Sequence, residues 1–493
     1  MLFHKKMISE RLSGLDPVYY YIIPAAFFTF MGIAFGPFGS YLFEEVLIIP
    51  CVLFLRSMLA HPLQKDAKKA FVLSGILFVW FFLLQILRDL AYFDVYPFAP
   101  YFCSYFFAFP MAALLRDGEE KKGLKLFFVV FLAAGLWHVT ATLLLFLDWI
   151  PAYFNEYHVF WDGGRLNSFW HPNMAACFLM FSIAACLAFL QSTTRKRTKL
   201  VFLACILILL IPLALTNCRT VIILTGGLLG GAAFYAILKG RWKLLIPGLV
   251  VVCAMVLVVY TGSNRLYQAH REVLIAELRA EYLQQQAENA AETTTTTETG
   301  ETAAPKAAAE AENAAKTTTT TETEVKISLG GTSGQSTLAN DITSLNSRTM
   351  LWNASLTALK ANKLYPIIGV DNPGRHMSYF SIFPDYHTHN SWMEVLLGLG
   401  IPGLAIAMVF TVITLWNGIV ILLKYPLDVW KRTTAMVTLC MMVASFMEPY
   451  LFLPPSDYHL FNFMFLLCAG YLFHWQQEDN RRMLQAVRKF LHI

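Results

Sequence analysis

The sequence has little charge for its length. Charged residues make up 14% of the 493 residues, hydrophobic residues make up 57%, and the mean hydropathy is +0.52. Soluble globular domains carry about 25% charged residues. The deficit here coincides with long uninterrupted apolar runs, which only lipid solvates favourably. These features exclude a soluble globular domain and predict a polytopic integral membrane protein.

Other absences narrow the class further. The net charge of +5 is too small to indicate a nucleic-acid partner. The nine cysteines lie in or beside apolar runs, and none lies in residues 260–386, so we expect no disulfide framework. No small-residue cleavage site follows the first apolar run. This favours a retained N-terminal helix over a signal peptide.

Apolar runs of roughly 17 to 25 residues predict about twelve transmembrane helices. They lie at residues 17–35, 41–60, 70–88, 93–115, 125–149, 171–191, 198–215, 220–238, 243–262, 402–423, 433–450 and 457–474. Lysine and arginine are concentrated in alternate loops, which places those loops and both termini in the cytoplasm. The opposite short loops hold few cations, chiefly Arg88, Arg165 and Arg219.

The predicted chain is therefore all-α, with one large outer loop between helices 9 and 10. Residues 1–262 carry helices 1–9, residues 263–389 form the loop, residues 390–474 hold a re-entrant or short helix and helices 10–12, and residues 475–493 are a cytoplasmic tail. Within the loop, AENAAETTTTTET recurs as AENAAKTTTTTET, and this Thr/Glu/Ala-rich insert at 287–324 is predicted to be disordered. Helical spacing of apolar residues resumes at Leu338 and ends before Pro366.

Three arginines at the predicted outer membrane edge are candidate binding residues: Arg165, Arg219 and Arg348. The diphosphate of a polyprenyl carrier lipid lies at that depth, and guanidinium groups bind phosphate oxygens bidentately while staying charged. No DxD or DD motif is present on the outer side to hold magnesium. Stabilisation of the leaving group by arginine alone is therefore favoured. The alternative for each arginine is snorkelling to lipid phosphates.

His389 is the best candidate for a general base, because a neutral imidazole can accept the proton of an attacking sugar hydroxyl. Glu394 lies about one turn further along the same helix and is the second catalytic candidate. His171 and His387 compete with His389, and a metal site at His387-x-His389 stays open as a weak alternative. We expect no metal and no cofactor. The less specific alternatives are an interfacial or capping histidine and a carboxylate that faces lipid headgroups.

These motifs occur in a characteristic order. Arg165 with Pro172-Asn173 comes first, Thr216-x-x-Arg219 follows, then Ser347-Arg348-x-x-x-Trp352 with Pro366-x-x-Gly369, and finally His389-Asn390-x-x-x-Glu394 with Gly400-x-x-Gly403. In this order and topology, over roughly residues 160 to 410, the chain resembles the O-antigen ligase and O-antigen polymerase family.

The resemblance implies a metal-independent, inverting glycosyltransferase of the GT-C type. Such an enzyme moves a glycan from a polyprenyl diphosphate-linked donor to a lipid-linked or wall-linked saccharide acceptor, on the outer face of the cytoplasmic membrane. By position it implies that Arg165, Arg219 and Arg348 contact the diphosphate, that His389 activates the acceptor, and that Asn173 and Asn390 support the site. The insert at 287–324 departs from the family pattern, so no acceptor is inferred from loop geometry.

Two other classes compete with this reading. A lipid-linked glycan flippase or other transporter would place ionisable residues or broken helices near the bilayer midplane, and the predicted spans are almost free of charge. A metal-dependent oligosaccharyltransferase would need a carboxylate pair in the first outer loop. Glu44-Glu45 is its one candidate, although such a pair more often marks a helix start. Ligase and polymerase share all the motifs quoted above.

Overall fold

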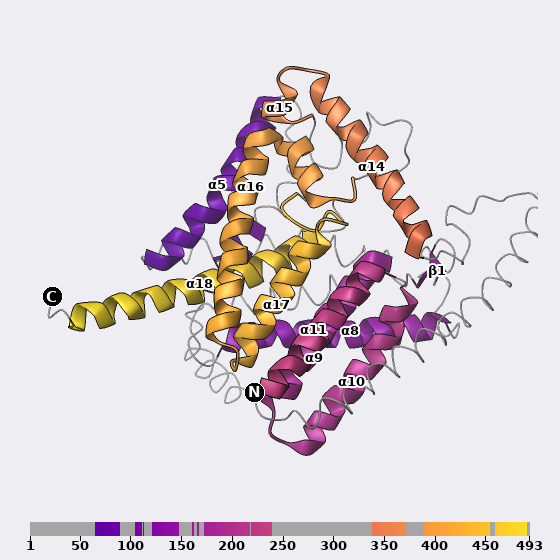
Figure 1. The fold of residues 1–493 in the computed structure, drawn as a ribbon, viewed down its shortest axis with the longest axis vertical. Helices are drawn as coiled ribbons and strands as arrows, with labels where there is room; N and C mark the ends of the chain where they lie inside the picture. Colours follow the sequence, from indigo (N-terminus) through magenta and orange to yellow (C-terminus); the bar gives the residue numbers. More distant parts are fainter. Residues whose placement is uncertain are drawn as a thin grey trace, which may run out of the picture.

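The computed structural model describes residues 65–88, 104–110, 112, 121–146, 160–161, 165–166, 172–216, 218–238, 338–370, 388–453 and 459–490. The described part is helical apart from one antiparallel pair of two-residue strands (Figure 1). The predicted spans at 17–35, 41–60 and 243–262, the insert at 287–324, and Glu44-Glu45, His171 and His387 lie outside the described residues.

The elements follow one another in the order α5 (Lys65–Arg88), the π-helical turn η1 (Ser104–Ala108), α8 (Lys122–Phe146), β1 (Phe160–Trp161), β2 (Arg165–Leu166), α9 (Pro172–Ser192), α10 (Lys196–Leu215), α11 (Arg219–Leu238), α14 (Leu338–Lys360), α15 (Tyr365–Ile368), α16 (Ser391–Lys424), α17 (Val429–Ala444) and α18 (His459–Phe490).

Four described helices are long and apolar enough to cross a membrane: Lys122–Thr140 within α8, and the whole of α9, α10 and α16. The helix α11 is shorter by this measure, with an apolar stretch over Arg219–Tyr235. Together with the composition, these helices confirm a helical integral membrane protein. The number of twelve helices and their topology stay predictions.

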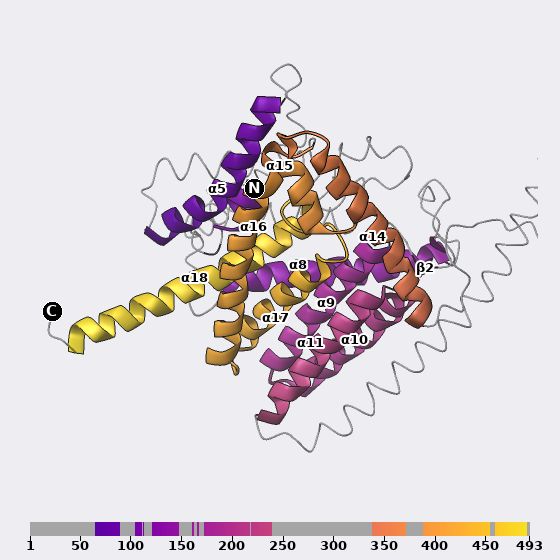
Figure 2. The same cartoon turned by 45° about the horizontal axis from the view of Figure 1, so that its top comes forward.

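Several predicted spans differ in extent from the structure, among them 93–115, 402–423, 433–450 and 457–474. Within 93–115, the described residues form the π-helical turn η1, a turn at Phe109-Pro110 and a helical Ala112. Beyond residue 474, α18 continues as a helix through most of the predicted tail. Its residues there are largely good helix formers, and Glu478 pairs with Arg482 one turn on at 2.8 Å. Figures 1 and 2 show this half of α18 extending away from the other described helices.

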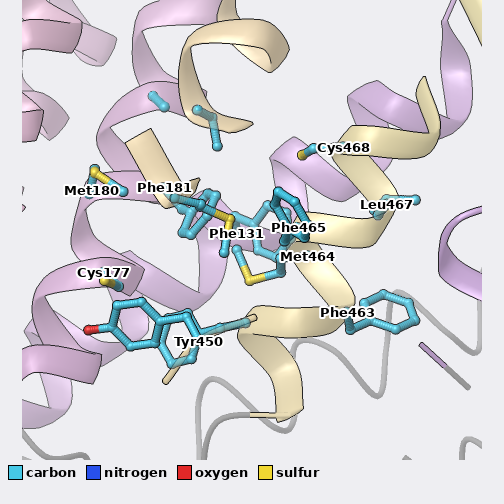
Figure 3. Close-up of a cluster of buried hydrophobic side chains, with 14 of the residues drawn as sticks. Phe131, Cys177, Met180, Phe181, Tyr450, Phe463, Met464, Phe465, Leu467 and Cys468 are labelled. Carbon is cyan, nitrogen blue, oxygen red and sulfur yellow. The ribbon is translucent and has the colours of Figure 1, made fainter. Parts of the chain in front are cut away.

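The core is built around α9, which contacts α8, α10, α11 and α17. Small residues let its neighbours approach closely, as is common between membrane helices. At Gly135 of α8 an added Cβ would lie 2.0 Å from the Ser182 hydroxyl, which donates to the Phe131 carbonyl at 2.8 Å. The first half of α18 packs on the same helix, with the rings of Phe461 and Phe178 stacked at 4.6 Å, and Figure 3 shows this region. Figure 2 shows α9, α10 and α11 lying side by side.

The helix α16 bends sharply at Gly400, close to α15 (Figures 1 and 2). Gly400 has φ 68°, and an added Cβ would lie 2.3 Å from the carbonyl oxygen of Ile367 in α15. Only glycine adopts this conformation and permits this approach without strain. The bend separates a short arm, residues 391–399, from a long arm, residues 401–424. The short arm carries three candidate residues at or beside its first turn.

Ionic side chains gather where α8 begins, α16 ends and α17 begins. Lys121 pairs with Asp428, the N-cap of α17. The buried Arg432 donates to the side chain of Gln191, at the end of α9. We call this the basic end of the bundle, and its ionic residues are Lys121, Lys424, Asp428, Lys431, Arg432 and Asp479.

Candidate active site

His389 and Asn390 lie at the start of α16. The Asn390 side chain caps the helix by accepting from the backbone N–H groups of Trp392 at 2.9 Å and Met393 at 3.1 Å. His389, just before the cap, has φ 53°, which is uncommon for a residue with a side chain. Such outliers persist only where the surrounding structure enforces them. Here hydrogen bonds from the segment that follows α17 hold the backbone at the start of α16.

This connection, residues 445–453, is bonded to the start of α16 at several points. The backbone N–H of Ser391 donates to the Ser445 carbonyl at 2.9 Å, and the Ser391 hydroxyl donates to the Glu448 carbonyl at 3.0 Å. The Ser391 hydroxyl also accepts from the Leu451 N–H at 3.0 Å. The Asn390 amide donates to another carbonyl of the connection at 3.1 Å. The connection and the start of α16 therefore form one fixed frame.

Glu448 lies in this frame and gathers three of the predicted site residues. Its side chain is buried, with the residue 4% exposed. Oε1 accepts from Nδ2 of Asn173 at 2.5 Å and lies 3.5 Å from Nη2 of Arg348. Oε2 lies 3.3 Å from Nδ1 of His389. Residues from α9, α14 and the start of α16 thus meet at a single carboxylate.

Glu448 is not among the site residues predicted from the sequence. It fell inside the predicted span 433–450. In the structure α17 ends at Ala444, so Glu448 lies beyond the helix, in the connection. An ionisable residue within an apolar run is a functional candidate by default, and the following Pro449 signals the helix end. These two signals were sufficient to identify it.

Arg348 reaches the frame from α14, where its side chain is 27% exposed. Its Nη1 also lies 3.3 Å from the sulfur of Met447. One turn further on, Trp352 donates from Nε1 to the Thr388 carbonyl at 3.0 Å, next to His389. The face of α14 that carries Arg348 and Trp352 therefore covers the frame, and Leu351 and Ser355 are buried on the same helix.

Glu394 is almost completely buried, at 1% exposed, and contacts the residue before His389. Its Oε1 accepts from the backbone N–H of Thr388 at 2.5 Å and from the Thr388 hydroxyl at 2.8 Å. This carboxylate therefore holds the turn that carries His389. Its burial contradicts the alternative that the Glu394 carboxylate faces lipid headgroups.

The positions of Arg219 and Arg165 follow from the helix and the strand that carry them. Arg219 is the first residue of α11, directly after the buried Cys218. The helices α10 and α11 both pack on α9, and because α10 leads back along α9, α11 begins at the end of the bundle where α9 begins, which is also where Asn173 contacts Glu448. Arg165 lies in β2 opposite Trp161, and β2 contacts α10. The structure brings Arg348, His389 and Asn173 together, and it places Arg219 at their end of the bundle.

The described residues offer hydrogen-bonding and ionic groups, and no group of three or more His, Cys, Asp and Glu side chains among them is arranged to hold a metal ion. The guanidinium of Arg348 and the imidazole of His389 meet at the carboxylate of Glu448. Such a set can bind an anionic group through arginine and accept a proton at histidine.

Comparison with known proteins gives a family match over part of the chain. Residues 203–408 match the protein-family model described as O-antigen ligase. The match includes Arg219, Arg348, His389, Asn390 and Glu394, whereas Arg165, Asn173 and Glu448 lie outside it. A comparison with curated proteins gives no match. Residues 203–408 are therefore similar to an O-antigen ligase domain, and this match supports the resemblance to the O-antigen ligase and O-antigen polymerase family.

Proposed function

We propose that this chain is a metal-independent, inverting glycosyltransferase that moves a glycan from a polyprenyl diphosphate-linked donor to a saccharide acceptor at the outer face of the cytoplasmic membrane. The observation that carries the proposal is the meeting of Arg348 and His389 at the buried Glu448. An anion-binding guanidinium and a proton acceptor lie on one carboxylate, as a transfer with an anionic leaving group requires.

The length of α9 supports an outer position for the candidate site. The helix α9 carries Asn173 at its start and ends beside Arg432 of the basic end, 21 residues in all. At 1.5 Å per residue it is about 30 Å long, close to the thickness of the hydrocarbon core. The basic end is expected in the cytoplasm. The candidate site therefore belongs at the outer boundary.

In the proposed reaction, an acceptor hydroxyl oxygen attacks the anomeric carbon of the donor sugar. The bond from that carbon to the diphosphate oxygen breaks, and its electron pair leaves with the diphosphate. The hydroxyl proton passes to His389. Single displacement inverts the anomeric configuration. Arg348, Arg219 and Arg165 neutralise the charge that develops on the leaving diphosphate.

The remaining predicted residues act through the frame. Glu394 holds Thr388 and so fixes the turn that carries His389. Asn390 caps α16 and bonds to the connection. Asn173 donates to Glu448 from the start of α9. Catalytic groups held by such partners keep their geometry during the reaction.

The test uses the purified full chain in lipid, with a polyprenyl diphosphate-linked oligosaccharide, candidate acceptors and EDTA. We expect the wild type to transfer the glycan and His389→Ala to lose roughly 10²- to 10⁴-fold in rate. Product length distinguishes ligation from polymerisation. If carrier lipid crosses the bilayer and no glycan is transferred, the transferase proposal fails and the flippase alternative replaces it.

A further inference from the structure

The ammonium group of Lys431, in the first turn of α17, lies among aromatic rings at the basic end. Its Nζ is 3.8 Å from the centre of the Tyr425 ring and 5.5 Å from the centre of the Trp475 ring. The residue is partly buried, and within the described part of the chain its side chain makes no hydrogen bond or ion pair. The rings stabilise this cation in part, but it lacks a negative partner.

The carboxylates at the basic end are already paired with other lysines. Asp428 pairs with Lys121, and Asp479 pairs with Lys424 at 3.1 Å. Burial lowers the pKa of Lys431, the carboxylates of Asp479 and Asp428 oppose this shift, and the charge of Lys121 adds to it. The pKa stays below its ordinary value, so the carboxylates present do not fully compensate the cations that surround them.

Lys125 supplies a second ammonium group of the same kind. It lies one turn after Lys121 on α8, and its Nζ is 5.6 Å from the centre of the Trp430 ring. Its side chain also makes no hydrogen bond or ion pair among the described residues. Lys121 faces the Trp475 ring at 5.9 Å, and this is the ring that Lys431 faces. Three ammonium groups from the starts of α8 and α17 therefore lie over two indole rings.

Exposed apolar side chains accompany these cations. Leu423, near the end of α16, is 77% exposed, and Leu427, in the turn before α17, is 57% exposed. Figure 1 shows α16 and α17 meeting at this turn. A soluble anion would leave such side chains in water, whereas a phospholipid brings a phosphate and acyl chains together. Basic sites between membrane helices on the cytoplasmic side bind anionic headgroups.

We infer that the basic end binds an anionic phospholipid of the cytoplasmic leaflet, with its phosphate held by Lys431 and Lys125 and an acyl chain against Leu423 and Leu427. The unpaired ammonium groups attract the phosphate electrostatically, and the aromatic rings keep them at the membrane boundary. This site lies at the end of α9, whereas Glu448 lies at its start. The inference is therefore independent of the proposed transfer reaction.

The test measures lipid binding by the purified full chain in detergent, without donor or acceptor. Phosphatidylglycerol and phosphatidylcholine with the same acyl chains are titrated separately, and bound lipid is counted by native mass spectrometry. We expect the wild type to prefer phosphatidylglycerol. Lys431→Gln removes the charge and keeps a polar side chain, and it should weaken phosphatidylglycerol binding about 5-fold without changing phosphatidylcholine binding. Lys125→Gln should do the same, and the double variant should lose about 25-fold.

Lys196→Gln is the matched control, because it removes the same charge from an exposed lysine at the start of α10, at the same end of the bundle. It should bind phosphatidylglycerol as the wild type does. An equal affinity of the wild type for the two lipids, or an equal loss in the control, would overturn the inference. Displacement of the lipid by an excess of inorganic phosphate would also overturn it, since the cations would then serve a soluble anion. Should Lys431→Gln not fold, Lys125→Gln on the other helix decides in the same way.

Discussion

At the scale of single residues, Arg348 uses two terminal nitrogens on two partners, Met447 at 3.3 Å and Glu448 at 3.5 Å. Lysine keeps the charge but has one compact ammonium in place of a planar fork. We expect Arg348→Lys to lose about 10²-fold in kcat, measured as the initial rate of glycan transfer. Arg482→Lys is the matched exchange at an exposed position paired with Glu478, and it should leave the rate unchanged. If Arg348→Lys transfers glycan as fast as Arg482→Lys, the alternative in which Arg348 contacts lipid phosphates is favoured over a role in donor binding.

At the scale of elements, the bend in α16 gives the short arm, and with it Asn390 and Glu394, a direction of its own. Gly400→Ala adds a Cβ 2.3 Å from the Ile367 carbonyl at a residue with φ 68°. We expect the free energy of unfolding to fall by about 1–3 kcal/mol, measured by thermal unfolding in detergent. Gly226→Ala is the control, because a Cβ on that exposed face of α11 meets nothing within 4 Å. A similar stability of both variants would show that the bend tolerates a side chain.

At the scale of the whole molecule, ionic groups lie at two ends of one bundle, and the basic end contributes stability. Burial acts to raise the pKa of the Asp428 carboxyl, but hydrogen bonds from Lys121 and from the backbone N–H of Lys431 outweigh it and hold the pKa below 3.8. A lowered pKa in the folded state stabilises the fold above the unfolded pKa, and this contribution is lost as pH falls through the folded value. We expect Asp428→Asn to lower Tm at neutral pH, this difference to begin to shrink below about pH 4, and it to vanish only below the lowered pKa of the folded state. A difference independent of pH would contradict the ion pair. Glu478→Gln, at a partly exposed side chain on α18, should show a much smaller difference.

Several features of this protein follow from composition and local pattern. Long apolar runs must form helices in lipid, because the backbone has no water to bond with there. The helices α9, α10 and α11 accordingly begin and end within two residues of the predicted spans. The motif His389-Asn390 was readable because a polar pair before an apolar run signals a helix start. The roles of Arg165, Arg219 and Arg348 stay predictions.

The tertiary structure alone decided what surrounds His389. Glu448 follows it by 59 positions, and Asn173 and Arg348 come from two further helices, so no local pattern specifies their meeting. It arises because the start of α16 and the connection after α17 satisfy one another's backbone groups, which brings a buried carboxylate beside the imidazole. Composition determined the membrane and the helices, since burial in lipid depends on runs of residue types. Packing determined the site, since a buried charge persists only where distant partners meet it.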